Sequence, residues 1–282
     1  MQSSPPLDFF EILLEPVPSM LNVKNSASAP EIVIVASAFG AQSVRRLGHA
    51  AWLDTVADAG AAGFEVRREL FSHEAEASCE ALHTLGAAVA ARGMWAVYST
   101  PAGLYRDDGT LDAPALAGAY AEADALGARW VKLQLGTFAE QADAATIVRV
   151  GAGRRARLVV ENGQHEQDGK IARFVALFAA LEREGASGAL GMTFDTGNWH
   201  WSGQAPLDAA AALAPHVEYV HCKSSEGLGA RRFPVAPAPD DSLFRSVLDI
   251  LPRTAPRGIE FPLDERAPAE DARRKVAWLA AA

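Results

Sequence analysis

Four short apolar runs of this sequence each end at a side chain that can bind a metal ion. The runs LVVEN, MTFDTGN, YVHCK and GIEF supply Glu161, Asp195, His221 and Glu260, which lie 34, 26 and 39 residues apart. Three converging carboxylates repel one another strongly unless a cation neutralises them. Three oxygen ligands and one imidazole suit Mn²⁺, Mg²⁺ or Co²⁺, whereas Zn²⁺ would be favoured by more His or Cys ligands. The pattern therefore predicts one divalent metal site.

The spacing of these ligands corresponds to about one strand and one helix per ligand. Apolar runs that are continuous, rather than alternating with polar residues, are typical of buried parallel strands. Eight strands are predicted near 31–38, 63–67, 94–99, 129–135, 157–161, 190–195, 217–223 and 257–261. Alanine-rich amphipathic segments between them, for example 43–59, 113–126, 170–183 and 268–280, are predicted to be helices. Gly60, Gly93, Gly127 and Gly185 follow helix-like runs, where a positive φ commonly ends a helix.

Eight consecutive β–α units predict an α/β protein with a (β/α)8 TIM barrel. Residues 30–282 would form this single domain, and residues 1–29, rich in Pro, Ser and Asn, would be an N-terminal extension. Active sites of such barrels lie at the carboxyl ends of the strands, where all four ligands fall. A doubly wound open sheet is the alternative, but it would not explain why ligands on strands five to eight converge. Residues 224–240 are predicted to be the longest loop, a lid or substrate loop on the same face.

Further polar side chains are predicted at the mouth of the barrel. Three of them end strands two, four and seven, and three directly follow the ligand strands; they are Arg67, Gln134 and Lys223, and Asn162, Asn198 and His200. All six are candidate substrate-binding residues, and the last three have the alternative role of orienting the ligands. Glu65 is predicted to pair with Arg67 or Lys132 inside the rim. The remaining histidines, His49, His73, His83, His165 and His216, are scattered and predicted to have solvated or capping roles.

The composition argues against several classes of protein. The 282 residues are 49% hydrophobic and carry a net charge of −9, without the basic face that nucleic-acid binding needs. Two cysteines, Cys79 and Cys222, make no disulfide framework, so a cytoplasmic location is expected. The sequence has no run of about 18 apolar residues, so no membrane span is predicted. The N-terminus has no basic segment ahead of an apolar stretch, so a signal peptide is not expected. The expected partner is a small molecule.

At the four ligands the chain resembles the xylose isomerase-like TIM-barrel superfamily, which includes an abasic-site endonuclease family (AP endonuclease family 2). It looks most like the sugar isomerase and epimerase branch, over about residues 31–280. The ordered set Glu161, Asp195, His221 and Glu260 matches the Glu–Asp–His–Glu metal set of ketose 3-epimerases. The phrases FDTGN and VHCKS resemble the DxGN/H and HxK signatures of the family.

The resemblance implies a metal-dependent isomerase or epimerase of a ketose or related polyhydroxy-carbonyl compound. Glu161 and Glu260 would act as acid and base through an enediolate, and Lys223 would stabilise the developing negative charge. Related barrels often form dimers or tetramers, so a homo-oligomer is compatible with the resemblance.

Two departures from the ketose 3-epimerase pattern keep other functions open. Asn198 stands where those enzymes usually have His, and the first arginines after His221 are Arg231 and Arg232. The main alternative is a metal-dependent dehydratase, a lyase, of a keto-cyclitol or a 3-dehydroshikimate-like keto acid. In that case Arg67, Arg231 or Arg232 would pair with a substrate carboxylate. An abasic-site endonuclease would need more His ligands and a basic surface, and a non-catalytic sugar-binding barrel would not need both Glu161 and Glu260.

Overall fold

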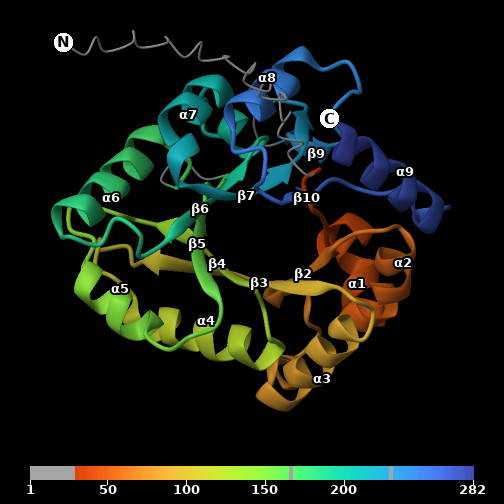
Figure 1. The fold of residues 1–282 in the computed structure, drawn as a ribbon, viewed down its shortest axis with the longest axis horizontal. Helices are drawn as coiled ribbons and strands as arrows, with labels where there is room; N and C mark the ends of the chain where they lie inside the picture. The colour runs from red at the N-terminus through yellow and green to blue at the C-terminus, as the bar shows by residue number, and fades with distance from the viewer. Residues whose placement is uncertain (1–28, 165–167, 229–230) are drawn as a thin grey trace, which may run out of the picture.

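A computed structural model describes residues 29–282 except 165–167 and 229–230, and its centre is a closed parallel barrel (Figure 1). The strands follow one another around the barrel in the order β1-β10-β7-β6-β5-β4-β3-β2. Their bounds are β1 Ile32–Val35, β2 Gly63–Arg67, β3 Trp95–Tyr105, β4 Trp130–Gly136, β5 Arg157–Glu161, β6 Gly191–Asp195, β7 Val217–Cys222 and β10 Arg257–Ile259. The TIM-barrel prediction is confirmed. The predicted extension over 1–29 lies, except for Ala29, outside the described residues.

Helices surround the strands, as Figure 1 shows. The α-helices are α1 Ala41–Leu47, α2 Leu53–Asp58, α3 Cys79–Ala90, α4 Ala113–Leu126, α5 Ala144–Gly151, α6 Ile171–Arg183, α7 Pro206–Leu213, α8 Ser242–Ile250 and α9 Pro268–Ala281. Short 3₁₀ helices are η1 Ala36–Phe39, η2 His49–Trp52, η3 Arg68–Leu70, η4 Glu74–Ala77, η5 Asn198–His200 and η6 Ala214–His216. The four glycines expected to end helices all have positive φ. Within the described residues, no helix is both long and apolar enough to cross a bilayer.

The buried apolar side chains form two clusters, one outside the barrel strands and one inside the barrel. The larger one lies between strands and helices, and the smaller one consists of Val33, Val97, Trp130, Val159 and Tyr219. Successive side chains of a strand point to opposite faces. Val159 therefore shares the inner face with Glu161, and Tyr219 shares it with His221. The smaller cluster thus fills the barrel below the ligands and leaves the mouth to polar side chains.

Three local predictions need correction. The predicted helix over 43–59 is divided at Gly48, whose φ is +79°, into α1, η2 and α2. The strand predicted over 94–99 continues to Tyr105 after a shift of register between Ser99 and Gly103. The predicted loop over 224–240 contains an antiparallel pair, β8 Ser224–Glu226 and β9 Phe233–Val235.

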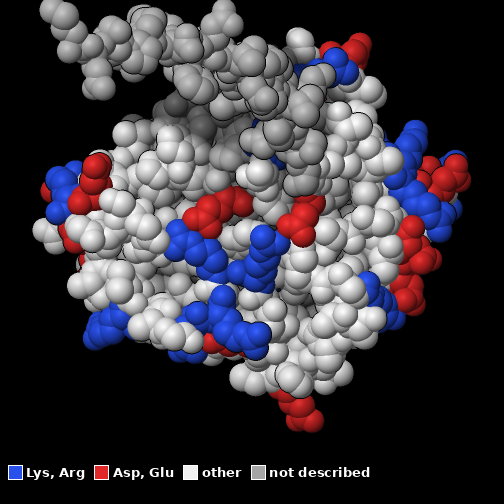
Figure 2. Space-filling model, viewed as in Figure 1, with Lys and Arg blue, Asp and Glu red and all other residues white. Residues whose placement is uncertain are grey.

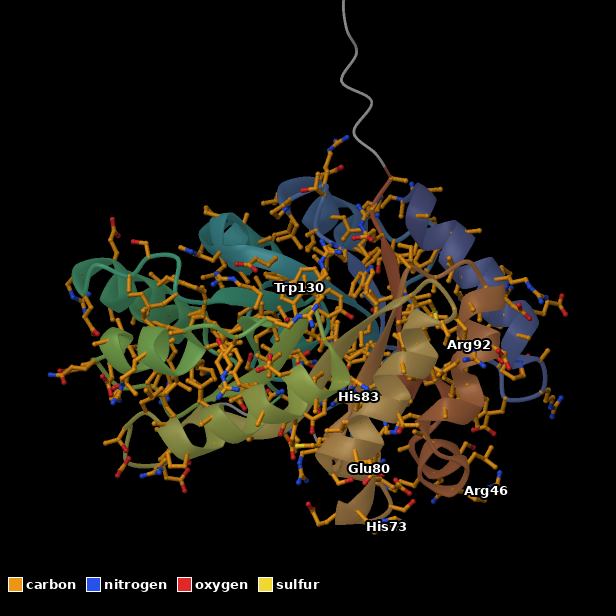
Figure 3. The ribbon with its side chains drawn as sticks, turned by 60° about the horizontal axis from the view of Figure 1, so that its bottom comes forward. Arg46, His73, Glu80, His83, Arg92 and Trp130 are labelled. Atoms are coloured by element: carbon orange, nitrogen blue, oxygen red, sulfur yellow. The ribbon has the colours of Figure 1, made fainter. Side chains whose placement is uncertain are left out.

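The scattered histidines occupy different environments. His73 and His83 are exposed, and Figure 3 shows them on the outer layer, whereas the labelled Trp130 lies further in. His49 contradicts the expected solvated role, because it is only 2% exposed and its Nε2 accepts a hydrogen bond from the backbone N–H of Arg67. The face in Figure 2 shows positive and negative side chains next to one another.

Candidate metal centre

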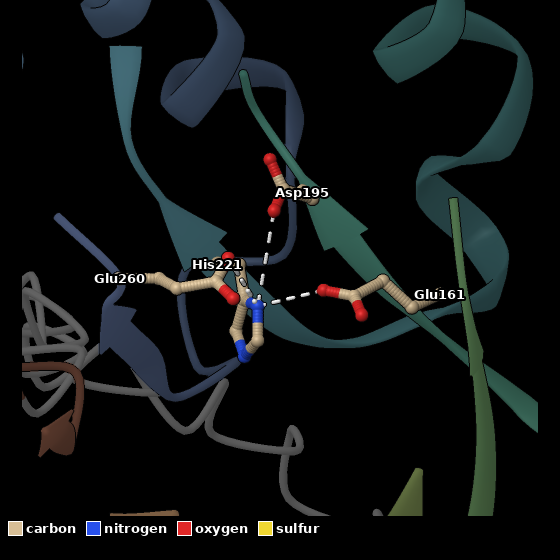
Figure 4. A group of neighbouring side chains, drawn as sticks. All are labelled: Glu161, Asp195, His221 and Glu260. Carbon is tan, nitrogen blue, oxygen red and sulfur yellow. Dashed lines mark hydrogen bonds and ion pairs between the residues drawn. The ribbon is translucent and has the colours of Figure 1, made fainter. Parts of the chain in front are cut away.

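The four predicted ligands come together at the mouth of the barrel (Figure 4). Glu161 and Asp195 are the last residues of β5 and β6, His221 lies in β7, and Glu260 directly follows β10. One donor atom from each residue lies within 4.8 Å of those from the other three. Strand pairing enforces this approach, since Asp195 pairs with His221 and Glu161 pairs with Thr193 in the parallel register.

His221 presents its Nδ1 atom to all three carboxylates. This nitrogen lies 2.7 Å from Glu161 Oε1, 3.0 Å from Glu260 Oε2 and 3.8 Å from Asp195 Oδ2. The other ring nitrogen, Nε2, lies 2.7 Å from Glu65 Oε2. The imidazole therefore lies between the three carboxylates of the centre on one side and a fourth buried carboxylate, that of Glu65 on β2, on the other.

The turn after β6 fixes the direction of the Asp195 carboxylate. Its Oδ1 atom accepts hydrogen bonds of 2.9 Å from the backbone N–H groups of Gly197 and Asn198, so Oδ2 faces the centre. The Asn162 side chain bonds the backbone N–H and C=O of Asp195 at 2.8 and 3.0 Å. Asn198 Nδ2 in turn donates to the Asn162 backbone oxygen at 2.7 Å. Both asparagines thus hold the carboxyl ends of β5 and β6 together.

Three cationic side chains hold the carboxylates. Lys132 Nζ lies 2.8 Å from Glu161 Oε2, and Gln134 Nε2 donates to the same oxygen at 2.9 Å. Lys223 Nζ lies 2.6 Å from Asp195 Oδ2 and 2.7 Å from Glu260 Oε2. Arg67 pairs with Glu260 Oε1 and with the neighbouring Glu69. Glu65, predicted to pair with Arg67 or Lys132, lies 3.0 Å from Lys132 Nζ.

The electrostatics of the centre favour a positive charge at its middle. Burial disfavours charge on the His221 imidazole, but Glu65, Glu260 and Glu161 outweigh it and raise the His221 pKa well above 6.5. Burial, reinforced by Glu260 and Glu161 and opposed by Lys223, raises the pKa of Asp195 to about 7. Burial also opposes ionisation of Glu161 and Glu260, yet nearby cations and His221 lower both pKa values. A divalent cation would supply the positive charge that these carboxylates stabilise.

The donor set fits a divalent metal ion. Glu161 Oε1 and Asp195 Oδ2 are buried and, among the described residues, accept no hydrogen bond of acceptable geometry, although His221 Nδ1 and Lys223 Nζ are near them. Together with Glu260 and the Nδ1 atom of His221, they offer three carboxylate oxygens and one nitrogen. This set matches what Mn²⁺, Co²⁺, Mg²⁺ or Zn²⁺ binds in proteins. The chain would hold the ion through these four atoms.

A cavity of about 470 Å³ opens in front of the centre. Of the six predicted substrate-binding residues, Arg67, Gln134, Asn198 and Lys223 line it, together with Glu161 and Glu260. Asn162 is fully buried and His200 lies at a smaller neighbouring cavity, so neither lines this one.

Sequence reasoning missed several residues of the cavity wall, namely Tyr105, Asp107, Gln164 and Asp168. Tyr105 belongs to the part of β3 beyond the predicted end at residue 99, and Asp107 follows that strand. Pro101 and Gly103 interrupt the apolar pattern there, so periodicity alone gave no signal.

Comparison with known proteins shows the fold only. No protein-family model matches the sequence, and no curated protein sequence is significantly similar to it. Solved structures that share the fold include IolI protein with a bound zinc atom, at 12% identity over 88% of this chain and 96% of that one, with a TM-score of 0.64. An L-ribulose 3-epimerase aligns at 18% identity over 89% and 95% of the two chains, with a TM-score of 0.62.

Two further solved structures of this fold have names that indicate other reactions. AsbF from Bacillus anthracis, described as a probable 3-DHS dehydratase, aligns at 11% identity over 88% and 98% of the two chains, with a TM-score of 0.60. Endonuclease IV from Thermus thermophilus aligns at 20% identity over 90% and 100%, with a TM-score of 0.58. A fusion protein described as containing a xylose isomerase-like TIM barrel aligns at 16% identity over 89% of this chain and 43% of that one, with a TM-score of 0.65, in line with the resemblance. The shared fold leaves the reaction to be argued from the site.

Proposed function

We propose that this chain is a divalent-metal-dependent isomerase or epimerase of a ketose or related polyhydroxy-carbonyl compound. The observation that carries the proposal is the convergence of Glu161, Asp195, His221 and Glu260 within 4.8 Å of one another beside the cavity. The shared fold with an L-ribulose 3-epimerase supports the same class of reaction. A divalent ion bound there would polarise a substrate carbonyl and stabilise the negative charge of an enediolate.

Glu161 and Glu260 are suited to move the proton. They lie on two sides of His221 in Figure 4, and both line the cavity. Because the pKa of each carboxyl is lowered, both are ionised near neutral pH, and either one is a base in its resting state. A substrate carbon between them would lose its proton to one carboxylate. Return of a proton to the opposite face gives epimerisation, and return to the neighbouring carbon gives isomerisation.

The cavity-lining polar residues would orient the substrate around this pair. Lys223 Nζ, 2.7 Å from Glu260 Oε2, is placed to stabilise negative charge that develops beside Glu260. Gln134 and Arg67 each hold one oxygen of a catalytic carboxylate, Gln134 on Glu161 and Arg67 on Glu260. Each could also donate a hydrogen bond to a substrate hydroxyl from the cavity wall.

A dehydratase is the second candidate, favoured by the shared fold with AsbF. The cavity argues against an acidic substrate of that kind. The positive charge of Arg67, one predicted partner for a substrate carboxylate, is already balanced by the carboxylates of Glu69 and Glu260, so Arg67 can donate a hydrogen bond to a neutral hydroxyl but leaves no net positive charge for an anion. Arg231 and Arg232, the other two, are not among the residues that line the cavity. An uncharged polyhydroxy ketone therefore fits the described walls better than a keto acid.

The test is incubation of the protein with ketoses, inososes and keto acids in D₂O with Mn²⁺, followed by NMR. Deuterium incorporation at a carbon next to the carbonyl, without loss of water, is expected. An enone or enol product would instead identify a dehydratase. Absence of any exchange or product across the panel, from protein shown to bind Mn²⁺, would contradict the proposed chemistry.

A further inference from the structure

Glu65 is a buried carboxylate beside the metal centre that the proposed reaction does not use. Glu65 lies on β2 and is 0% exposed at the base of the metal centre. Its side chain crosses the inside of the barrel to β7, which is separated from β2 by β1 and β10. An unpaired charge in such a place is costly, so its partners indicate its role.

Glu65 bonds both inward-facing residues of β7. Its Oε2 atom lies 2.7 Å from His221 Nε2 and accepts a 3.0 Å hydrogen bond from the Tyr219 hydroxyl. Its other oxygen, Oε1, lies 3.0 Å from Lys132 Nζ. Lys132 also reaches Glu161, so the carboxylate is held from two strands and cannot rotate away from the imidazole without losing these contacts.

This contact decides which nitrogen of His221 can bind a metal ion. An ionised carboxylate only accepts hydrogen bonds, so the ring nitrogen that faces Glu65 must carry a proton. Nδ1 also faces carboxylates, those of Glu161, Asp195 and Glu260, but a divalent ion bound among these three would take the place of a proton on Nδ1. The lone pair that binds the ion would therefore be the one on Nδ1. A carboxylate that accepts the second N–H of a ligand histidine fixes both its tautomer and its ring orientation and raises its basicity as a ligand.

We propose that Glu65 is a positioning residue for the metal centre, which holds His221 as an Nδ1 ligand. The inference rests on the proposed function, because it presumes that the four-residue centre binds a divalent ion. Glu65 does not touch the cavity, so its effect on any substrate passes through His221.

Metal affinity measured by calorimetry tests the role without an assay of activity. The dissociation constant for Co²⁺ is expected to rise about 10–100-fold in Glu65→Gln. The rise should be greater in Glu65→Leu, which offers the imidazole no acceptor. Glu122→Gln is the matched control, because Glu122 also accepts a tyrosine hydroxyl, at 2.7 Å from Tyr98, and pairs with a cation, Arg68, away from the centre. That control should bind Co²⁺ as wild type does.

A second measurement does not depend on the folding of the Glu65 variants. In the Zn²⁺-loaded wild type, ¹H–¹⁵N NMR of the imidazoles, with His221→Gln as the blank, should show the proton of His221 on Nε2. A proton on Nδ1 would overturn the proposal, as would folded Glu65 variants that bind Co²⁺ with wild-type affinity. If the wild type itself bound no divalent ion, the proposed function would fail together with this inference. Failure of the Glu65 role alone would leave wild-type binding intact.

Discussion

Replacement of Asp195 by Asn should remove the metal response while leaving the fold unchanged. Asp195 Oδ1 accepts two backbone N–H groups at 2.9 Å, and Asn can preserve both bonds with its amide oxygen. The amide NH₂ then takes the place of Oδ2, which faces the centre and lies 2.6 Å from Lys223 Nζ. A donor group cannot bind a cation, so the variant loses one ligand through a nearly isosteric change.

The size of the effect follows from the linkage between binding and unfolding. At Co²⁺ concentrations of about 100 times the dissociation constant, binding stabilises the native state by about 2.7 kcal/mol. For a domain of this length, that free energy raises the melting temperature by about 5 °C. If Asp195→Asn weakens binding about 100-fold, the same Co²⁺ concentration contributes only about 0.4 kcal/mol, or less than about 1 °C.

Differential scanning calorimetry with and without Co²⁺ measures this difference directly. Asp107→Asn is the control, since Asp107 is an exposed carboxylate at the cavity edge and not one of the four ligands. It should keep the full shift. A wild-type shift that survives in Asp195→Asn would show that Co²⁺ binds elsewhere, and the assignment of the centre would be wrong.

Three further predictions concern catalysis, acid stability and helix packing. Glu161→Gln and Glu260→Gln should each lower kcat by about 10²–10⁴-fold with an unchanged circular dichroism spectrum, and near wild-type turnover in either would exclude the two-carboxylate mechanism. Burial, partly offset by a backbone hydrogen bond, lowers the pKa of His49 from 6.5 to about 4. As pH falls, His49 of the unfolded chain is protonated before His49 of the folded chain, so the free energy of unfolding decreases between about pH 6.5 and pH 4. Urea titrations over this range should show a smaller decrease in His49→Gln. A Cβ at Gly86 would lie 2.0 Å from a backbone oxygen at the end of α4, whereas Gly118 has open space. Gly86→Ala should therefore destabilise the fold by about 1–3 kcal/mol in urea titrations, and Gly118→Ala should stabilise it by up to about 1 kcal/mol.

The barrel and the meeting of the four candidate ligands were predictable for one physical reason. Buried parallel strands are continuous apolar runs, and closure of the barrel brings all their carboxyl ends to one mouth. The position of a candidate ligand at the mouth of the barrel can therefore be predicted once the sequence shows that it ends a strand. This holds even for Glu260, which lies one residue beyond β10.

Other features depend on contacts that no periodicity encodes. The short strands β8 and β9 were predicted as loop, because Pro234 lies within β9 and each strand has only three residues. His49 was predicted to be solvated, although the chain buries it through tertiary packing against Phe71 and Phe64. The Glu65–His221 contact joins residues 156 positions apart across the barrel interior. Sequence could identify Glu65 as a buried partner for a cation, but not the ring nitrogen that it faces.

The two proposed catalytic carboxylates differ in their hydrogen-bond and ion-pair partners, and this difference bears on how the site would respond to substrate. Glu161 forms an ion pair with Lys132, which is fully buried beneath the cavity, and accepts a hydrogen bond from Gln134. Glu260 follows the end of its strand and is fastened by Arg67 and Lys223, both of which line the cavity. A substrate hydroxyl that enters can compete for those two cations, whereas it cannot reach Lys132. Substrate binding would therefore change the hydrogen bonding, and hence the basicity, of Glu260 more than that of Glu161.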